Sequence, residues 1–379
     1  MAWTHFQKVL ALMMVITGTF NTLSVKYADI LVVPGQDGEP RNFKHPFMQS
    51  AFMFLGEMMC LLVFKIAFCY FNRLGNGSVD THSLTKGSRT FNPLVLAIPA
   101  ICDMTATSIM YVGLTMTNAS SFQMLRGAVI VFTGLLSVGF LNKKLGSREW
   151  TGIIFVILGL SVVGISDVTS MKNTHVDSNA VITGDLLIII AQIIQSIQMV
   201  VEEKYVAGLD IPALQAVGWE GVFGLTGICL VMLPLNFIHA PPPFVDNARG
   251  TLEASIDALI QIGNSGRLFM AIVGIVLSIA LFNFSGISVT KELSATTRMI
   301  LDSVRTITIW AFSLLFRWQE FNPWQLVGFT LLLTGMSCYN NVVIPQLLRK
   351  CRYRLGRHSP PADAERVVNT AADEYDGAH

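Results

Sequence analysis

The chain has 379 residues, of which 52% are hydrophobic and only 13% are charged, and its mean hydropathy is +0.54. This composition excludes a set of ordinary soluble domains and is typical of an integral membrane protein. The formal net charge of +1 gives no reason to expect nucleic acid as a partner. None of the six cysteines belongs to a CxxC pair, so neither a disulfide framework nor a zinc site is expected.

Apolar windows of about 20 residues recur along the chain, and this is the length that a helix needs to cross a bilayer. The first window continues past any small-residue cleavage site up to Lys26, so we expect it to be retained as a span rather than removed as a signal peptide. The predicted spans are 8–26, 46–71, 93–116, 119–142, 149–167, 183–202, 213–239, 268–290, 294–316 and 324–345. The sequence therefore predicts an all-α membrane protein with ten transmembrane helices.

The basic residues outside these spans indicate an orientation. With both termini in the cytosol, most of them lie on the cytosolic side, including Lys143, Lys144, Arg148 and the basic run 349–357. The positive-inside rule favours this arrangement. The tail that follows the last span is basic at first and then polar and acidic, so we expect it to be disordered.

The longest loop on the opposite side covers residues 240–267. It opens with three consecutive prolines and continues with a polar stretch at 252–261, which predicts a short surface helix. Such a loop is either a plain connector or a lid over the end of the helix bundle.

The ninth span carries three charges on one helix face. Arg298, Asp302 and Arg305 are separated by four and three residues, so their side chains project within roughly 60° of one another. A charge at bilayer depth costs a few kcal/mol, and it normally faces a bundle interior or a watery cavity, where it often marks a solute path. We expect these three residues to bind or gate a solute.

The fourth span places Ser121, Gln123 and Arg126 in its first turns. A buried guanidinium offers five donors and suits a carboxylate or a phosphate. In the third span, Asp103 is either a proton- or cation-responsive carboxylate or a structural partner of Arg126, and the two roles are compatible. Thr107, one turn after Asp103, either joins the same site or donates back to its own helix, the simpler role for a hydroxyl.

Four further polar residues lie deep in predicted spans. Glu57 and Glu220 are expected to be structural, and the glycines on either side of Trp219–Glu220 predict a close approach of two helices. Gln195 and Asn283 either face a cavity or hold neighbouring helices together. Because the deep carboxylates nearly balance the deep arginines, the sign of the substrate stays open.

An internal repeat is indicated by a shift of 176 residues, the difference between 119 and 295. The shift crosses five spans, an odd number, so the two halves would be inverted in the membrane. The matches are Ala119 on Ala295, Leu125 on Leu301, Ser137 on Ser313, Phe140 on Phe316, Gly152 on Gly328, Gly159 on Gly335 and Ser161 on Ser337. We expect one five-helix repeat at 1–170, a second at 171–348, and the tail at 349–379. The shift also sets Arg126 opposite Asp302, as two parts of one gate.

No catalytic pattern is present: GxSxG, HExxH and phosphate-loop motifs are missing, and the histidines show no metal-ligand spacing. We therefore expect neither an enzyme nor a bound cofactor or metal.

Three strings carry a resemblance to a known family: SSFQMLRGAVIVFTGLLSVGFLNKKL, VGWEGVFG and ISVTKELSATTRMILDSVRTITIW. Together they resemble the drug/metabolite transporter superfamily, more closely the F subgroup of solute carrier family 35, and more distantly the malarial chloroquine-resistance transporter. The resemblance implies an EamA-like fold of two inverted five-helix repeats around a central cavity, with alternating access. It also implies an intracellular membrane, lysosomal first and mitochondrial second.

The function expected from residues and resemblance together is secondary-active transport of a small polar or charged metabolite, of which a nucleotide sugar is one candidate, with a proton or counter-substrate as the driving partner. Without a nucleotide-binding motif, transport must be driven by a gradient or by exchange. The alternative, from a different class, is a membrane adaptor that uses the transporter fold to bind a membrane-protein partner without flux. A partner in crosslinking and no flux of any solute would distinguish it.

Overall fold

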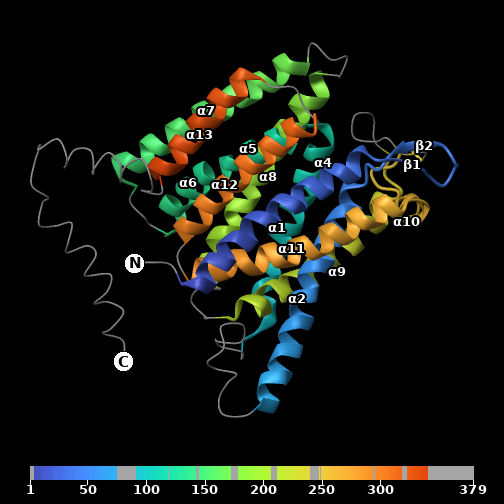
Figure 1. Ribbon diagram of the computed structural model, residues 1–379, viewed down its shortest axis with the longest axis horizontal. Coiled ribbons are helices and arrows are strands. Elements are labelled where there is room, and N and C mark those ends of the chain that lie inside the picture. Colours follow the sequence, from blue (N-terminus) through green and yellow to red (C-terminus); the bar gives the residue numbers. More distant parts are fainter. Residues whose placement is uncertain are drawn as a thin grey trace, which may run out of the picture.

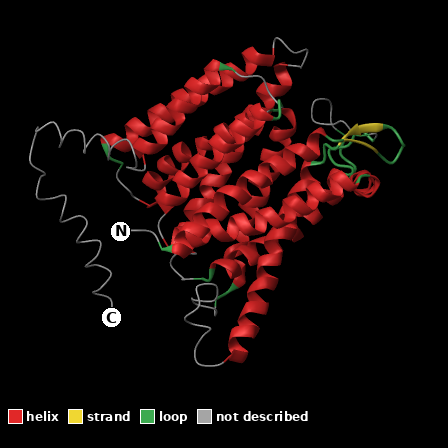
Figure 2. Cartoon of the chain, in the orientation of Figure 1, coloured by secondary structure: helices red, strands yellow, loops and turns green. Residues whose placement is uncertain are grey.

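The computed structural model of the chain is a bundle of long helices with one small hairpin at its edge (Figures 1 and 2). It describes residues 4–74, 91–117, 119–141, 145–171, 178–205, 211–239, 247, 249–292, 295–317 and 322–339. The tail at 349–379, which the sequence predicts to be disordered, lies outside these residues.

Each predicted span contains a long stretch of helix in the described residues. The helices are α1 His5–Ile30, α2 Pro46–Leu74, η1 Pro93–Leu96, α4 Ala97–Met116, α5 Ala119–Leu125, η2 Arg126–Ala128, α6 Val129–Leu141, α7 Ser147–Met171, α8 Ser178–Tyr205, α9 Ala213–Leu235, α10 Ser255–Asn264, α11 Gly266–Glu292, α12 Ala295–Leu315 and α13 Pro323–Tyr339. The two strands are β1 Val32–Pro34 and β2 Pro40–Asn42, which pair antiparallel.

Seven helices in the described part of the chain are long and apolar enough to cross a membrane: α1, α2, α4 with η1, α7, α8, α9 and α11. Ser121–Leu136 and Val304–Leu315 are shorter apolar helices. Large apolar side chains such as Leu62 and Ile66 of α2 point outward and are more than half exposed. A lipid-facing surface explains this exposure, because in water it would be costly. An all-α membrane protein is therefore confirmed.

Helix α1 begins where its sequence provides a cap. The Thr4 hydroxyl accepts a hydrogen bond from the Gln7 backbone N–H over 3.2 Å, and the Gln7 side chain accepts from the Thr4 backbone N–H over 3.0 Å. This capping box satisfies N–H groups that a helix start would otherwise leave unpaired. From this start α1 runs to Ile30, beyond the predicted end at Lys26, so Lys26 lies inside the helix.

Four pairs of helices make the most extensive contacts: α1 with α11, α2 with α9, α4 with α8, and α7 with α13. Glycines allow the closest approaches. In α9, Gly221 lies against the backbone of Glu57 and Met58 in α2, and Gly218 lies against Leu61. The predicted close approach beside Glu220 is thus confirmed, and its partner is α2.

Helices α7 and α13 lie side by side at one edge of the bundle (Figure 1). A Cβ on Gly152 would lie 2.8 Å from the carbonyl oxygen of Gly335, and a Cβ on Gly159 would lie 2.8 Å from the carbonyl oxygen of Gly328. Because neither contact leaves room for a side chain, these four glycines fix where the two helices cross.

The β1–β2 hairpin and α10 together form a small cap at one end of the bundle, opposite the end where α1 begins (Figure 1). The Gln36 backbone N–H donates to Asp257 of α10, and Asn264 donates to the Pro34 carbonyl over 3.0 Å. The predicted surface helix therefore exists as α10. It packs against the hairpin, so the described part of this loop is more than a plain connector.

A buried charge cluster holds the cap to α2. Glu253 accepts hydrogen bonds from the backbone N–H groups of Met48 and Ala254, and its carboxylate lies 2.6 Å from Nδ1 of His45. The Nε2 atom of His45 lies 3.8 Å from Asp257, and Arg41 approaches the same carboxylate to 3.9 Å. His45, Glu253 and Asp257 are all buried, so the cap is a packed structure.

The fourth span differs from its prediction. The sequence predicts one helix over 119–142, whereas the structure breaks it into α5, a 3₁₀ turn at Arg126–Ala128, and α6. Gly127 lies in this turn, where a Cβ would come within 2.7 Å of the Met336 side chain of α13. Glycine weakens the helix locally and allows this contact, and such a turn within a helix often marks a hinge.

Candidate functional site

A buried polar contact inside the bundle is centred on Arg305 of α12. Its side chain is 5% exposed, and its Nη2 atom lies 3.2 Å from Oδ1 of Asp302 on the same helix. The same nitrogen donates to Oε1 of Gln123 in α5 over 3.3 Å, and the guanidinium lies over the ring of Phe282 at 4.6 Å. A planar cation suits both an amide oxygen and an aromatic face.

Gln123 extends this contact to the first helix. Its Nε2 atom donates to the Thr22 hydroxyl over 2.8 Å, and Thr22 donates to the Gly18 carbonyl oxygen over 3.3 Å. Gly18 also makes room for Arg305, because a Cβ there would lie 2.6 Å from Cδ of that side chain. We call Thr22, Gln123, Arg305 and Asp302 the polar chain; it connects α1, α5 and α12.

Two more arginines lie near the polar chain. Arg126 and Arg298 are both within electrostatic range of Arg305. Arg298 lies against Gly286 of α11, with its Cζ atom 3.3 Å from the position of a Cβ there. Arg126 lies at the break in the fourth span, 5.8 Å from the centre of the Phe122 ring. We call Arg126, Arg298 and Arg305 the arginine cluster.

The polar chain departs from the predicted gate in one respect. The sequence sets Asp302 opposite Arg126, whereas the recorded ion pair of Asp302 is with Arg305, one turn along its own helix. Arg126 does lie in the same region, within range of Arg305. The hydrogen bond between α12 and α5 is made by Gln123, three residues before Arg126 and the 3₁₀ turn.

The other predicted site residues form separate contacts. The Thr107 hydroxyl donates to Asp103 over 3.2 Å instead of to its own helix carbonyl, so the simpler role given to it is wrong. Ser121 accepts from Gln325 of α13 over 3.4 Å, and Gln195 donates to Gln198 of its own helix over 2.6 Å.

Glu57 and Asn283 form a further contact between helices. The Nδ2 atom of Asn283 in α11 donates to Glu57 of α2 over 2.7 Å, and the Glu57 side chain is buried. This supports the structural role predicted for Glu57. The contact is of the kind that holds helices together, which is one of the two alternatives predicted for Asn283.

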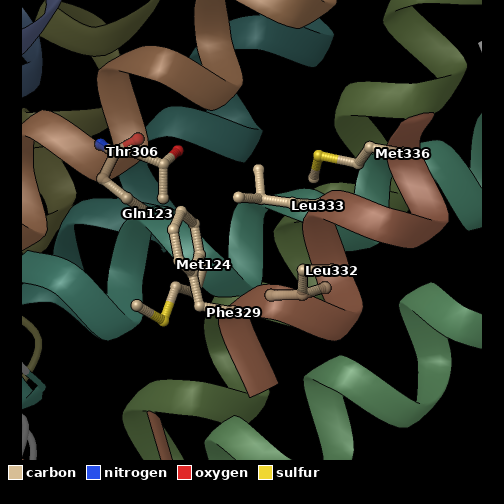
Figure 3. A pocket seen from close by; sticks show the side chains of 7 residues that line it. All are labelled: Gln123, Met124, Thr306, Phe329, Leu332, Leu333 and Met336. Carbon is tan, nitrogen blue, oxygen red and sulfur yellow. The ribbon is translucent and has the colours of Figure 1, made fainter. Parts of the chain in front are cut away.

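A cavity with an empty volume of about 200 Å³ lies beside the polar chain, between α5, α12 and α13 (Figure 3). Gln123 and Thr306 form its polar side, and the rest of its lining is apolar: Met124, Phe329, Leu332, Leu333 and Met336. Its enclosed part has a volume of about 10 Å³, which is roughly the space of one water molecule. A metabolite therefore does not fit this cavity in the described conformation.

Sequence reasoning missed several residues that contact these charges. Thr22 and Phe282 lie in apolar windows without any pattern that singles them out. Lys26 was predicted only as the end of the first span, although its Nζ atom donates to the carbonyl oxygens of Leu114 and Thr117 at the end of α4. The sequence signal that could have singled out Lys26 is Asp29, an opposite charge three residues later and so on the same helix face.

Comparison with known proteins identifies the family. The family model described as nucleotide-sugar transporter matches residues 4–222, which cover α1 to the first half of α9. Solute carrier family 35 member F6 of Rattus norvegicus is 50% identical over 97% of this chain and 97% of its own length. The chain belongs to solute carrier family 35.

The chain is also similar to two more distant proteins. The UDP-N-acetylglucosamine transporter of Rattus norvegicus is 28% identical over 46% of this chain and 54% of its own. A solved crystal structure of another protein, 10% identical, superimposes with a TM-score of 0.51 over 89% of this chain and 96% of its own. At that identity the likeness concerns the fold alone.

Membership of solute carrier family 35 establishes the class of protein. The chain is a multi-pass membrane protein of a solute transporter family. This family assignment supports transport of a small molecule and indicates that the protein is not an enzyme. The matched residues 4–222 include Thr22, Gln123 and Arg126, whereas Arg298, Asp302 and Arg305 lie in the half beyond the match.

Proposed function

We propose that this member of solute carrier family 35 is a secondary-active transporter of an intracellular membrane that moves a small anionic metabolite of the nucleotide-sugar class by alternating access. The observation that carries the proposal is the arginine cluster around a buried Arg305. Arg126 and Arg298 both act electrostatically on Arg305, whose ion pair is with Asp302, and we infer that the cluster is net positive.

Arg305 also has hydrogen-bonding capacity to spare. Its Nε atom is buried, and no acceptor among the described residues pairs with it. A buried donor without a partner is costly, and a phosphate or carboxylate oxygen would satisfy it with a charge-assisted hydrogen bond. The diphosphate of a nucleotide sugar provides such oxygens, and a relative is named as a UDP-N-acetylglucosamine transporter.

Alternating access requires two halves that can exchange roles, and we assign them to residues 1–170 and 171–348. The crossing of α7 and α13 supports this division. In the repeat with a shift of 176 residues, Gly152 corresponds to Gly328 and Gly159 corresponds to Gly335. The contact of Gly152 with Gly335 therefore corresponds to the contact of Gly328 with Gly159, and both contacts are present. A two-fold axis between inverted repeats would produce this exchange.

The helix pairs follow the same rule. The repeat relates α1 to α8 and α4 to α11, so the pair α1–α11 becomes the pair α8–α4, and both pairs are in extensive contact. The repeat also relates α2 to α9 and α7 to α13, and the two helices of each of these pairs contact each other. This pattern supports a ten-helix arrangement in which the shorter apolar helices, α5 with α6 and α12, are also membrane spans.

Within this proposal both termini are cytosolic, and the cap faces the interior of the organelle. A lysosomal membrane is the first assignment and a mitochondrial membrane the second, both from family resemblance. The polar chain closes the path between α1, α5 and α12. An anion that binds the arginine cluster competes with Gln123 and Asp302 for Arg305, and so separates these helices.

Untargeted metabolite profiling tests the function without prior choice of a substrate. Organelles isolated from cells that express the wild-type chain, the variant Arg305→Gln, or no chain would be compared. We expect the pool of at least one phosphorylated or otherwise anionic metabolite to change with the wild-type chain and not with the variant. Pools that are the same in all three preparations would contradict transport and favour the membrane adaptor.

A further inference from the structure

A second set of buried charges lies at the capped end of the bundle, away from the arginine cluster. Lys26, near the end of α1, donates from Nζ to the carbonyl oxygens of Leu114 over 3.0 Å and Thr117 over 2.7 Å. These oxygens belong to the last turn of α4 and its C-cap, where the helix leaves carbonyl groups unpaired. Lys26 therefore ties α1 to the end of α4.

The tie continues to α8. The Thr117 hydroxyl donates to Oδ1 of Asp185 over 2.9 Å, and Asp185 is buried near the start of α8. Lys26 and Thr117 thus connect the ends of three helices on the capped side. We call this set the capped-end tie.

Asp29 lies three residues after Lys26 on the same helix and is 4% exposed. Its Oδ1 atom accepts from Nε2 of Gln49 in α2 over 2.8 Å, but its Oδ2 atom is buried without a hydrogen-bond partner. The Oε1 atom of Gln49 is also buried without a partner. Buried acceptor oxygens nearly always have a hydrogen-bond donor. The unpaired oxygens of the contacting side chains Asp29 and Gln49 therefore indicate that a donor binds here.

We propose that Asp29 is a proton-binding site, and that its protonation keeps the capped end closed by leaving Lys26 on the carbonyl oxygens of α4. The proposal deepens the proposed function, since it names what regulates the path through the same bundle. The proton comes from the aqueous compartment on the capped side, binds Oδ2, and returns to that compartment when the carboxyl group ionises.

The surroundings of Asp29 favour a proton over a metal cation. The charged or titratable groups that act on it are Lys26 from its own helix and Lys44 and His45 from the segment before α2. A metal cation would be repelled by the two ammonium groups, whereas a proton neutralises the carboxylate and adds the missing donor. His45 in turn contacts Glu253 and Asp257, so it is a second titratable group to control for.

Ionised Asp29 is the competing partner of Lys26. Residues three apart on a helix are neighbours, so a small rotation of the Lys26 side chain exchanges the α4 carbonyl oxygens for the Asp29 carboxylate. An opposite charge attracts the ammonium group more strongly than neutral carbonyl oxygens do. Acid on the capped side therefore closes this end, and a rise in pH releases α4 and opens it.

Two spin labels can report the opening without any substrate. Ile30 at the end of α1 and Ile182 near the start of α8 are both exposed and suit labels in a full-length, reconstituted chain whose native cysteines have been replaced. For the wild type we expect the distance distribution from pulsed electron paramagnetic resonance to shift to longer values between pH 5 and pH 8. Asp29→Asn, a permanently neutral side chain, should hold the short distance at both pH values.

Matched variants separate the sensor from its neighbours. Lys26→Gln should lose the pH response too, which keeps the test valid if Asp29→Asn fails to fold. Asp37→Asn and His45→Gln should keep it. Asp37 is a suitable control aspartate because its hydrogen bond from Arg41 holds its pKa below the usual range, so it stays ionised between pH 5 and pH 8.

Infrared difference spectra between the same pH values would detect the proton itself. The carbonyl band of a protonated carboxyl group should be present at pH 5 and should be lost in Asp29→Asn but not in Asp37→Asn. Three results would overturn the proposal. The distance between the spin labels in the wild type does not change with pH, Asp29→Asn responds to pH like the wild type, or only His45→Gln abolishes the response. Because neither readout needs a transported solute, both can succeed or fail independently of the proposed function.

Discussion

Arg305 of α12 donates a hydrogen bond to Gln123 of α5 over 3.3 Å, and this contact joins the two spans that the internal repeat relates to each other. Both side chains are buried, and Gln123 in turn donates a hydrogen bond to the hydroxyl of Thr22 in α1. The guanidinium group of Arg305 is thus held by an amide oxygen and one carboxylate, and in the proposed function it also binds the anionic substrate.

The first prediction concerns the charge and shape of this group. Arg305→Gln removes the charge, and Arg305→Lys keeps the charge but loses the planar fork that binds two oxygens at once. A hydrogen bond to a charged group contributes about 1.5–3 kcal/mol, so uptake of an anionic substrate should fall about 10- to 100-fold in Arg305→Gln. Arg305→Lys should fall between that variant and the wild type.

Initial uptake rates in proteoliposomes, corrected for the amount of inserted protein, would measure this. Arg148→Gln is the matched control, because Arg148 lies exposed in the first turn of α7 beside Glu149. Arg305→Gln with wild-type rates would remove Arg305 from the site.

The second prediction concerns Gly18, which makes room for Arg305. In Gly18→Ala the new methyl group would lie 2.6 Å from Cδ of Arg305 and 2.7 Å from the Phe282 ring, so the guanidinium must move away from Gln123. We expect uptake to fall several-fold while the chain still inserts and folds. Gly164→Ala is the matched control, since a Cβ there meets nothing within 4 Å. Equal uptake rates in the two variants would show that the position of Arg305 does not matter.

The third prediction concerns the crossing of α7 and α13. Gly159→Ala puts a methyl group 2.8 Å from the carbonyl oxygen of Gly328, which is backbone and cannot rotate away. Overpacking of this kind costs about 1–3 kcal/mol, so the midpoint of thermal unfolding in detergent should fall. Gly328→Ala should have a similar effect, because it meets the carbonyl oxygen of Gly159 at 3.0 Å. A midpoint no lower than that of Gly164→Ala would argue against this crossing.

The fourth prediction concerns the cap. Glu253→Ala leaves the backbone N–H groups of Met48 and Ala254 without their acceptor and His45 without its closest carboxylate. Each unsatisfied buried donor costs about 1–3 kcal/mol, so the hairpin and α10 should separate. Hydrogen exchange at residues 31–45 should then speed up, while exchange in α7 stays the same. Asp37→Asn, at the exposed tip of the hairpin, should change little.

Much of the fold could be predicted because its signal is local. Apolar windows of membrane length predict helices, and each of them is helical in the described residues. The three charges of 294–316 share one face, and this predicts that Arg305 turns inward, as it does. Matching glycines 176 residues apart could also be read from the sequence, and they turn out to form the α7–α13 crossing.

The partners could not be predicted, because they depend on small changes in helix geometry. Gln123, three residues before the turn at Arg126–Ala128, makes the hydrogen bond to Arg305, whereas Arg126 is only within electrostatic range of it. Lys26 stands at the edge of an apolar window, where a basic residue normally faces water. Only the position of the α4 end shows that its long side chain reaches carbonyl oxygens inside the bundle.

Counterflow tests the central claim, transport of a nucleotide-sugar-like anion, most directly. Proteoliposomes that contain the wild-type chain and an excess of unlabelled UDP-N-acetylglucosamine would be diluted into a trace of the labelled compound, alongside a panel of other nucleotide sugars. The account predicts that label from at least one of them accumulates transiently above its equilibrium level, and that Arg305→Gln lowers the initial rate of this accumulation about 10- to 100-fold. Accumulation no greater than in protein-free liposomes for every member of the panel would contradict it.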